Sequence, residues 1–493
     1  MQKQTGELTM GFKDFATKTT INTALNYINN NPEKNLPRLM DFVNLVMKND
    51  TSYPGPRAAF TGVINDPDNN LHKLLIDAFN DIDIDIIKKA FTNFVINANF
   101  EGWEKQQEYR KKYGCNIPWT ILMDPTSACN LKCTGCWAAE YGNRLNLSID
   151  EIDDIIRQGK EMGVYFYIYT GGEPLVRKKD LIEICRRHND CIFMCFTNGT
   201  LIDQDFADQL KEVKNFYPVV SIEGDREATD FRRGKGTYDK VMRALDILHK
   251  NKLPIGVSCC YTAKNIPSIV SDEFMDSLID KGVKYAWYFH YMPVGNDADA
   301  SLLPSPKQRE YMYHRIRQIR ETKEIFPMDF QNDGEYLQGC IAGGRRYFHI
   351  NANGDMDPCV FIHYSDSNIR EKSILEGLMS PMFMQYRNHQ PFNSNHLRPC
   401  PMLENPEALE EMVHHTNAHS TDLESPETVE HQVEKCKEYA EKWKPEAENL
   451  WKKSHHIPYK ETHEYIMTQE QYNSEVLPKL QKQIDERSHP KNQ

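Results

Sequence analysis

The residues best suited to chemistry are three closely spaced cysteines in the stretch DPTSACNLKCTGCWAAEYG. Cys129, Cys133 and Cys136 follow the pattern C-x3-C-x2-C, so a single loop can bring three thiolates around one centre. A structural zinc site would need a fourth ligand nearby, and no Cys or His follows within about forty residues. Three thiolates are the right number to hold a [4Fe-4S] cluster and to leave one iron open to a substrate or cofactor. A zinc loop and unmetallated thiols are the alternatives.

The chain contains thirteen cysteines, and its N-terminus lacks the apolar core of a signal peptide. We therefore expect reduced thiols that are available to metals or to chemistry rather than to disulfides. A second, looser group consists of Cys340, Cys359 and Cys400. The others mostly lie in apolar runs, where a small buried hydrophobe is the default interpretation. They are Cys115, Cys185, Cys191, Cys195, Cys259, Cys260 and Cys436.

Short apolar runs alternate with amphipathic segments between Pro118 and about residue 327, which predicts alternating strands and helices. The runs are continuously apolar, as in strands covered on both faces of a parallel sheet. They span 119–124, 164–170, 191–197, 216–223, 255–262 and 285–294. Six strand–helix repeats predict an α/β fold with an open, partial parallel (β/α)6 barrel, since eight repeats close the usual form.

Polar residues follow these strands, at the end of the barrel where function concentrates in this fold. They are Gly171, Gly172, Glu173 and Pro174 after the second strand, Thr197 and Asn198 after the third, Ser221 and Glu223 after the fourth, and Arg232 and Arg233 in the next segment. The glycines let a cationic amine approach backbone carbonyls, and the carboxylate beside them adds complementary charge.

With these elements in this order, the sequence resembles the radical S-adenosylmethionine (radical SAM) enzymes, whose signature is C-x3-C-x2-C after the first strand of a partial β/α barrel. The resemblance implies a [4Fe-4S] cluster on the three thiolates and a site for the amino group of S-adenosylmethionine at residues 171–174. Polar side chains such as Ser221 and Glu223 would hold ribose hydroxyls. Arg232 or Arg233 would pair with the methionine carboxylate in a bidentate manner.

Two apolar residues complete the cofactor site that the resemblance implies. Met292, at the end of the last strand, would form a wall for adenine. Family members usually carry an aromatic residue just before the third cysteine, but Gly135 stands there in this chain. Trp137 follows the third cysteine and is expected to take over that role.

The chemistry implied by the resemblance starts from the open iron. S-adenosylmethionine would chelate it, a reduced cluster would pass one electron to the sulfonium, and the carbon–sulfur bond would break. The resulting 5′-deoxyadenosyl radical would take hydrogen from an unactivated carbon. A low-potential electron donor such as a flavodoxin or ferredoxin is then an expected partner. A barrel interior capped by extra domains suits the exclusion of water and solvent thiols.

The second cysteine group is similar to the opening of the SPASM/twitch extension, because Cys340 and Cys359 stand in the pattern C-x13-G-x4-C. Together with Cys400 they would hold one auxiliary [4Fe-4S] cluster. The fourth position of this cluster would be either non-Cys or open. The candidate residues for a fourth ligand are Glu404, His414, His415 and Cys436. A zinc-bound or unmetallated hairpin is the alternative.

His290 is the one candidate catalytic side chain outside these groups. On its strand it alternates with Tyr288 and Met292, opposite Trp287 and Phe289. If its face lines the barrel, His290 would donate hydrogen bonds or handle protons. A satisfied core histidine is the competing interpretation.

Flanking segments suggest four units. A helical N-terminal domain over 1–115 precedes the barrel over 116–326, a small Cys-containing α+β extension follows over 327–404, and a helical tail occupies 405–493. The helical start is expected to be a cap or an oligomer surface.

Composition limits the partners. Lys and Arg total 59 against 71 Asp and Glu, a net charge of -12 that works against nucleic-acid binding. No uncharged apolar run is long enough to span a membrane, so we expect a cytoplasmic protein. The substrate stays open: a peptide or protein is slightly favoured, and a small molecule or lipid chain is the alternative. A non-enzymatic iron–sulfur electron carrier or sensor explains the cofactor elements poorly.

Overall fold

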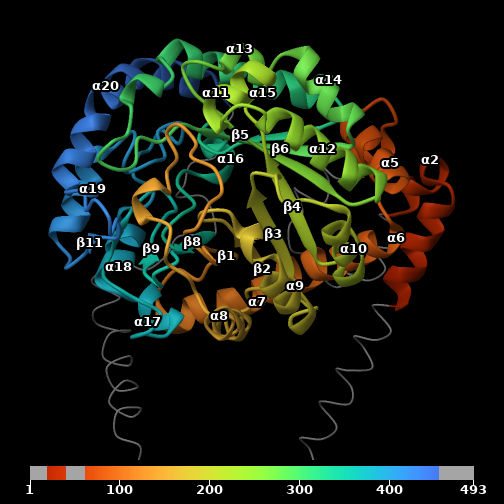
Figure 1. Cartoon of the computed structure of the whole chain (residues 1–493), viewed down its shortest axis with the longest axis horizontal. Coiled ribbons are helices and arrows are strands. Elements are labelled where there is room, and N and C mark those ends of the chain that lie inside the picture. The colour runs from red at the N-terminus through yellow and green to blue at the C-terminus, as the bar shows by residue number, and fades with distance from the viewer. Residues whose placement is uncertain (1–18, 40–60, 455–493) are drawn as a thin grey trace, which may run out of the picture.

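The computed structural model describes residues 19–39 and 61–454, and its centre is a partial parallel barrel with helices outside it (Figure 1). Six parallel strands follow one another in chain order across the sheet. They are β1 (Thr120–Met123), β2 (Phe166–Tyr169), β3 (Ile192–Thr197), β4 (Phe216–Ser221), β5 (Ile255–Tyr261) and β6 (Val283–His290). Each lies in or overlaps a predicted apolar run, so the α/β prediction and the six-stranded core are confirmed.

The sheet continues beyond the six predicted strands at both edges. β7 (Phe326–Asp329) adds to β6, and β8 (Tyr347–Ile350) adds in parallel to β1. β9 (Met356–Asp357) then runs antiparallel to β8 and forms a hairpin with it. The Cys-containing extension therefore shares a sheet with the barrel, and this pairing places the second cysteine group beside the first strand.

The helices between the strands cover the outer face of the sheet (Figure 1). They are α8 (Ile149–Glu161), α9 (Lys178–Arg187), α10 (Gln204–Val213), α11 (Arg226–Arg233), α12 (Thr237–Lys250), α13 (Ile266–Ile269), α14 (Asp272–Asp280) and α15 (Pro306–Thr322). In α8, Ile152, Ile155 and Ile156 form the buried stripe. A capping box of Ser148 and Glu151 begins this helix by satisfying backbone N–H groups that have no partner within it.

The inner face of the sheet differs from the outer one in exposure. On β3, β5 and β6 alternate residues are fully buried under helices, while those between them are partly exposed. The partly exposed ones include Met194, Phe196, Ser258, Cys260, Tyr285, Trp287 and Phe289. The rings of Phe196 on β3 and Trp287 on β6 lie 5.5 Å apart, although β4 and β5 separate their strands in the sheet. These residues therefore face one another across the barrel interior.

N-terminal helices close the amino end of the barrel. They are α2 (Pro32–Asn35), η1 (Leu36–Arg38), α5 (Asn70–Asp81), α6 (Ile84–Ala90), the π-helical η2 (Phe91–Glu101) and α7 (Gly102–Tyr113). Asn93 donates to the Cys191 carbonyl just before β3 at 2.6 Å, and Gln106 donates to the Gly163 carbonyl before β2 at 2.8 Å. The described part of this segment thus covers the amino ends of β2 and β3.

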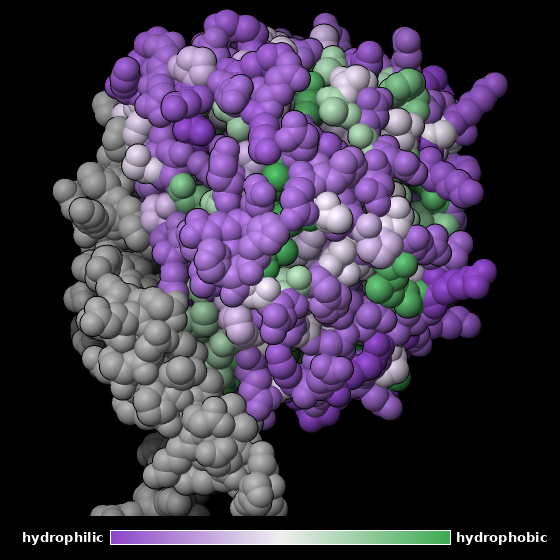
Figure 2. All heavy atoms as spheres, turned by 90° about the vertical axis from the view of Figure 1, so that its left-hand side faces the viewer, coloured by the Kyte–Doolittle hydropathy of each residue, from purple (hydrophilic) through white to green (hydrophobic). Residues whose placement is uncertain are grey.

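The C-terminal part packs on the opposite side of the barrel from α2 and α5 (Figure 1). It contains α16 (Gly334–Leu337), α17 (Ile374–Leu378), α18 (Pro381–His389), α19 (Pro406–His414), the strand pair β10 (Tyr364–Ser365) and β11 (His419–Ser420), and α20 (Val429–Lys453). The face that carries α19 and α20 is mostly hydrophilic, with apolar residues in small separate patches (Figure 2). No helix within residues 19–39 and 61–454 combines the length and apolarity needed to cross a bilayer.

Candidate active site

The cysteine loop follows β1 and is tied to the segments after β2 and β3. The Glu173 N–H donates to the Ala128 carbonyl at 2.8 Å. The Asn198 side chain donates to Asn130 Oδ1 at 2.8 Å. The predicted elements after two different strands are thereby brought against the loop that carries the three thiols.

The thiols themselves fit an iron–sulfur cluster. Cys129 is exposed, and Cys133 and Cys136 are partly exposed. Burial raises the pKa of the Cys133 thiol, and the nearby Arg233 and Arg232 guanidinium charges offset only part of that rise. Within the described ranges, no three His, Cys, Asp or Glu side chains are placed to hold a single metal ion. Three thiols in one loop are the donor set of a [4Fe-4S] cluster with one open iron, whereas a closed zinc site would need a fourth ligand.

Gly171 and Gly172 allow the segment after β2 to touch the cysteine loop. Gly171 has a φ of 104°, a conformation that favours glycine. A Cβ at Gly172 would lie 2.3 Å from the Ala128 carbonyl oxygen, and one at Gly171 would lie 2.7 Å from that of Thr126. Pro174 then begins the short helix η4 (Pro174–Arg177). Any side chain at the two glycines would displace the loop, so both positions serve its placement.

Glu173 is predicted to supply charge to a cationic amine, but its carboxylate is already bonded within the protein. Its Oε1 accepts from the Thr197 hydroxyl at 2.6 Å and from the Leu175 N–H at 3.0 Å, and its Oε2 accepts from the Asn198 N–H at 2.7 Å. Burial raises its pKa, and these hydrogen bonds oppose the rise. Glu173 and Thr197 thus position the segments after β2 and β3, a role that the sequence pattern did not indicate.

The Glu223 carboxylate, predicted as a ribose ligand, pairs with two of the three arginines of α11, Arg232 and Arg233. Its Oε1 lies 2.7 Å from Arg232 and 2.5 Å from Arg233. Burial raises the pKa of Glu223, but the two guanidinium charges outweigh it and the net shift is downward. Arg232 also donates to the Gly135 carbonyl at 3.3 Å, while its buried Nε has no hydrogen-bond partner within the described residues. Ser221 is buried at the end of β4.

The ring beside the third cysteine comes from a different element than predicted. A Cβ at Gly135 would lie 2.6 Å from the Tyr291 ring, so Tyr291, just after β6, occupies the space next to this glycine. Trp137 instead packs edge-on against Phe361 of the extension, with centroids 6.3 Å apart. Met292 is buried beside Tyr291 in the chain, as an apolar wall requires.

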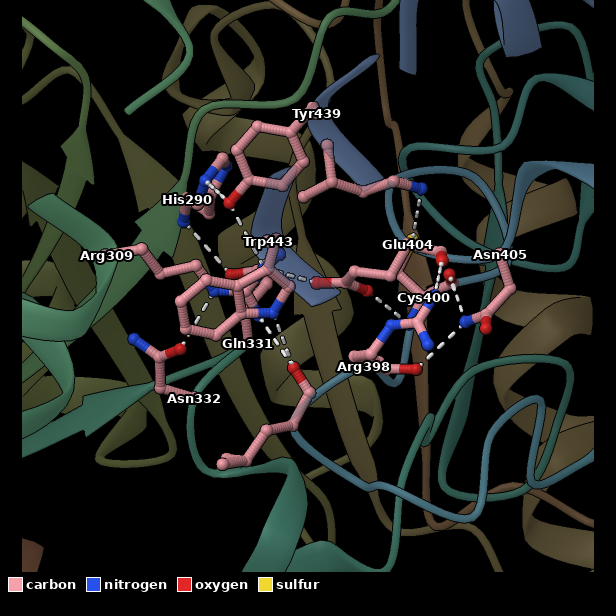
Figure 3. Close-up of polar contacts among 12 residues, drawn as sticks. His290, Arg309, Gln331, Asn332, Arg398, Cys400, Glu404, Asn405, Tyr439 and Trp443 are labelled. Atoms are coloured by element: carbon pink, nitrogen blue, oxygen red, sulfur yellow. Dashed lines mark hydrogen bonds and ion pairs between the residues drawn. The ribbon is translucent and has the colours of Figure 1, made fainter. Parts of the chain in front are cut away.

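His290 lies on the outer face of the sheet, so the condition for its proton-handling role is not met. It is buried, with Nδ1 2.6 Å from the Tyr291 carbonyl and Nε2 2.8 Å from the Tyr439 hydroxyl of α20 (Figure 3). Burial and the nearby Arg309 charge lower its pKa well below the usual value, so the ring is neutral. Nδ1–H therefore donates to the carbonyl, and Nε2 accepts from Tyr439. The structure supports the interpretation as a satisfied core histidine.

The second cysteine group gathers where the extension packs on the barrel. Cys340 lies 3.2 Å from the Tyr386 hydroxyl, and Cys359 lies 2.9 Å from the Tyr347 hydroxyl of β8. Burial raises the pKa of Cys359 to about 12, and the Cys340 thiol adds to the shift. Cys340 and Cys359 also act on the pKa of Cys400 in the same direction. The three thiols are thus near enough to raise one another's pKa.

The four candidates for a further ligand all have other contacts. Glu404 Oε1 lies 2.5 Å from Arg309, and its Oε2 accepts from the Cys400 N–H at 2.6 Å (Figure 3). The other contacts are His414 with Glu430 at 2.9 Å, His415 with the Glu411 carbonyl at 2.8 Å and Cys436 with Gln432 at 3.8 Å. Glu404 is therefore a neighbour of the Cys400 backbone in this arrangement.

A buried acid–imidazole network between β1 and β8 was not anticipated. His349 Nε2 lies 2.9 Å from Asp124 Oδ1, and Nδ1 lies 3.3 Å from Asp357 Oδ2. Burial lowers the pKa of His349, but the two carboxylates outweigh it and raise the value to about 9. Tyr141 donates to Asp357 at 3.2 Å and stacks on His363. Asp124 directly follows β1, so the sequence could have indicated it as a candidate site residue. Nothing local in the sequence marks His349 as its partner.

The comparisons with known proteins agree with this geometry. A family model described as the radical SAM superfamily matches residues 123–278, from the end of β1 onward. The chain is 30% identical over 312 residues to a cysteine-type anaerobic sulfatase-maturating enzyme of Clostridium perfringens, covering 55% of this chain and 82% of that enzyme. It is 28% identical over 320 residues to an Fe-coproporphyrin III synthase of Methanosarcina barkeri, covering 57% and 79%. Its fold is similar to Streptococcus suis SuiB bound to S-adenosylmethionine, with a TM-score of 0.51, 19% identity and coverage of 68% and 81%.

Proposed function

The chain belongs to the radical SAM superfamily, and from this premise we propose that Cys129, Cys133 and Cys136 hold a [4Fe-4S] cluster at which S-adenosylmethionine is cleaved to start radical chemistry on a substrate. One observation carries the proposal: the segments after β2 and β3 and the helix α11 all bond to the single loop that bears three thiols. An electron carrier or sensor would need the thiols but not the converging segments.

The cofactor would supply, when bound and reduced, the 5′-deoxyadenosyl radical that removes hydrogen from an unactivated carbon. The chain's own residues bind and orient it. Gly171 and Gly172 bring backbone groups to the loop, where an amine can approach carbonyls without a side chain between them. We assign the methionine carboxylate to Arg232, whose buried Nε is a free donor within the described residues. Tyr291 and Met292 provide the apolar wall.

We propose a second cluster at Cys340, Cys359 and Cys400. The contacts of Cys340 with Tyr386 and of Cys359 with Tyr347 of β8, where the extension packs on the barrel, support it, with the fourth iron open or bound by a non-Cys group. A flavodoxin- or ferredoxin-type donor would supply electrons of low potential. The division at residues 115, 326 and 404 stays part of this proposal, with the qualification that β7 and β8 join the barrel sheet.

Two substrate classes fit this machinery. The sulfatase-maturating relative acts, by its name, on a protein, which favours a peptide or protein substrate here. The second class is a small molecule, and the synthase relative, named for Fe-coproporphyrin III, favours it. The alignment with each relative covers a little more than half of this chain, so neither name decides between the two substrate classes.

Anaerobic reconstitution tests the proposal directly. We expect about eight iron and eight sulfide per chain with both clusters, and 5′-deoxyadenosine on addition of reductant and S-adenosylmethionine. Changing Cys129, Cys133 and Cys136 to Ala should abolish 5′-deoxyadenosine, whereas Cys185→Ala in α9 should not. Changing Cys340, Cys359 and Cys400 to Ala should leave about four iron. Cleavage that persists in the first triple variant would contradict the proposal.

A further inference from the structure

Two tyrosine hydroxyls are directed at thiols of the second cysteine group. The hydroxyl of Tyr386, on α18, lies 3.2 Å from Cys340 Sγ, and that of Tyr347, the first residue of β8, lies 2.9 Å from Cys359 Sγ. Both tyrosines are buried. Within residues 19–39 and 61–454, neither hydroxyl has a second hydrogen-bond partner. Each of these buried hydroxyls therefore depends on a cysteine sulfur for its hydrogen bond.

Sulfur is an unusual partner for a buried tyrosine. Tyr167 and Tyr217, which are also buried, donate to the backbone carbonyls of Val164 at 2.9 Å and Lys214 at 2.7 Å. A neutral thiol is a weaker hydrogen-bonding group than a carbonyl. A thiolate, in contrast, is a charged acceptor and forms a stronger bond. The two hydroxyls are thus suited to cysteines that have lost their protons, which is the form that binds a metal.

Packing holds both tyrosine rings in place. The Tyr386 ring packs edge-on against Phe392 with centroids 4.9 Å apart, and a Cβ at Gly343 would lie 2.2 Å from it. The Tyr347 ring lies 6.1 Å from that of Phe330, and its backbone is paired with β1. Dipoles that are fixed in advance stabilise an added charge without having to rearrange. The two hydroxyls therefore act as permanent donors to the thiols.

The third thiol of the second group also has a donor. The Leu403 N–H donates to Cys400 Sγ at 3.4 Å. The three donors thus come from α18, from β8 and from the turn after Cys400. The first cysteine group differs, because Cys129 accepts from the Leu131 N–H at 3.5 Å and, in the described part of the chain, no tyrosine hydroxyl bonds to a thiol of that group. The hydroxyl donors therefore distinguish the second group from the first.

We propose that Tyr347 and Tyr386 raise the reduction potential of the second cluster by donating hydrogen bonds to its Cys359 and Cys340 thiolates. The inference rests on the proposed function, because it needs the second cluster. Hydrogen bonds to the sulfurs are among the factors that set the potential of an iron–sulfur cluster. The two hydroxyls stabilise the reduced form more than the oxidised form, since reduction adds one negative charge.

This role requires no proton transfer. The single electron comes from the flavodoxin- or ferredoxin-type donor, and both hydroxyls keep their protons. A cluster with a raised potential takes up an electron more readily. The two tyrosines therefore suit a second cluster that accepts and passes on electrons.

A redox titration followed by electron paramagnetic resonance tests the proposal. The parent is the triple Cys→Ala variant of the first cysteine group, because its remaining iron belongs to the second group. Tyr347→Phe and Tyr386→Phe each remove a hydroxyl, keep the ring and should lower the midpoint potential. In the double variant, the ratio of reduced to oxidised cluster at a fixed potential should fall about tenfold, which is about 59 mV for a one-electron couple. Tyr217→Phe, which removes a buried hydroxyl bonded to a carbonyl, is the matched control and should leave the potential unchanged.

A stronger donor at the same position provides a test that removes no group. Replacement of Tyr347 by 3-fluorotyrosine makes the phenol more acidic and thus a better donor, so the potential should rise in slightly acidic buffer, where this phenol keeps its proton. Damage to the packing would not be expected to raise the potential in this way. This variant decides the question if the phenylalanine variants fail to assemble the cluster.

The outcomes separate this inference from the proposed function. A parent without iron after reconstitution would remove the second cluster and, with it, this role of the tyrosines. A parent that holds about four iron and keeps its potential in the double variant would overturn the role of the tyrosines alone. An equal fall of the potential in the Tyr217→Phe control would also overturn it, as would a fall with 3-fluorotyrosine.

Discussion

Removal of one partner of the Arg309–Glu404 ion pair should be severely destabilising. Both side chains are fully buried, and the pair is 2.5 Å long. Arg309 also donates to Asn332 at 3.0 Å and lies over the Trp443 ring at 4.3 Å. Arg309→Met would leave the Glu404 carboxylate buried without its counter-charge, which typically costs about 3–5 kcal/mol of unfolding free energy.

The size of this loss distinguishes a buried pair from a surface pair. Arg186→Met, which breaks an exposed pair with Glu212, is the matched control and should change stability within experimental error. The double variant Arg309→Met/Glu404→Met should lose less than Arg309→Met alone, because it leaves no unpaired charge. Burial raises the pKa of Glu404 in the folded protein, so the Arg309→Met variant should regain stability as the pH falls and the carboxyl is protonated.

Denaturant unfolding of the reconstituted protein, followed by tryptophan fluorescence, provides the measurement. A loss below about 1 kcal/mol for Arg309→Met would show that the pair behaves like a solvated one and would refute the reasoning. A double variant as damaging as the sum of the two single variants would refute it in a second way, since the cost would then come from packing rather than from an unpaired charge.

Three further outcomes follow from the site. The pKa of His349 is about 9 in the folded protein against about 6.5 when unfolded, so its protonated form adds on the order of 3 kcal/mol to the free energy of unfolding below pH 6.5. This contribution is lost as the pH rises through 9, and His349→Gln should flatten that part of a profile of melting temperature against pH. Glu173→Ala should weaken S-adenosylmethionine binding about tenfold or more in equilibrium dialysis with iron retained, because Thr197 and Asn198 lose their acceptor, and a loss of iron would contradict this positioning role. Gly172→Ala should weaken the same binding by a similar factor, since its Cβ would meet the loop backbone, whereas Gly62→Ala, with open space around it, should have no effect.

The barrel could be predicted because its signal is local. Continuous apolar runs of strand length, separated by capped amphipathic helices, specify buried parallel strands without any long-range information. The order of polar residues after those strands then predicted which segments meet. The capping box of Ser148 and Glu151 at the start of α8 is one such local signal.

What could not be predicted depends on partners far away in the sequence. The alternation on β6 showed that His290 and Trp287 face opposite sides, but only the packing of α20 decides that His290 is on the outside. Glu173 and Glu223 were recognised as site residues, yet their partners depend on which donors the fold brings near. The parallel pairing of β8 with β1 joins residues more than two hundred positions apart, and no local pattern indicates it.

Contacts of the C-terminal helix α20 link the surroundings of the two cysteine groups. Glu404 accepts from the Cys400 backbone and pairs with Arg309, which donates to the Tyr439 hydroxyl at 3.2 Å (Figure 3). Tyr439 donates to His290, and His290 donates to the Tyr291 carbonyl. The Tyr291 ring fills the space beside Gly135 in the first cysteine loop. The links among Glu404, Arg309, Tyr439 and His290 are buried, where hydrogen bonds to charged groups are strongest and unpaired groups are costly. A shift of α20 would thus disturb both cysteine loops together, which a helical tail merely attached to the surface would not do.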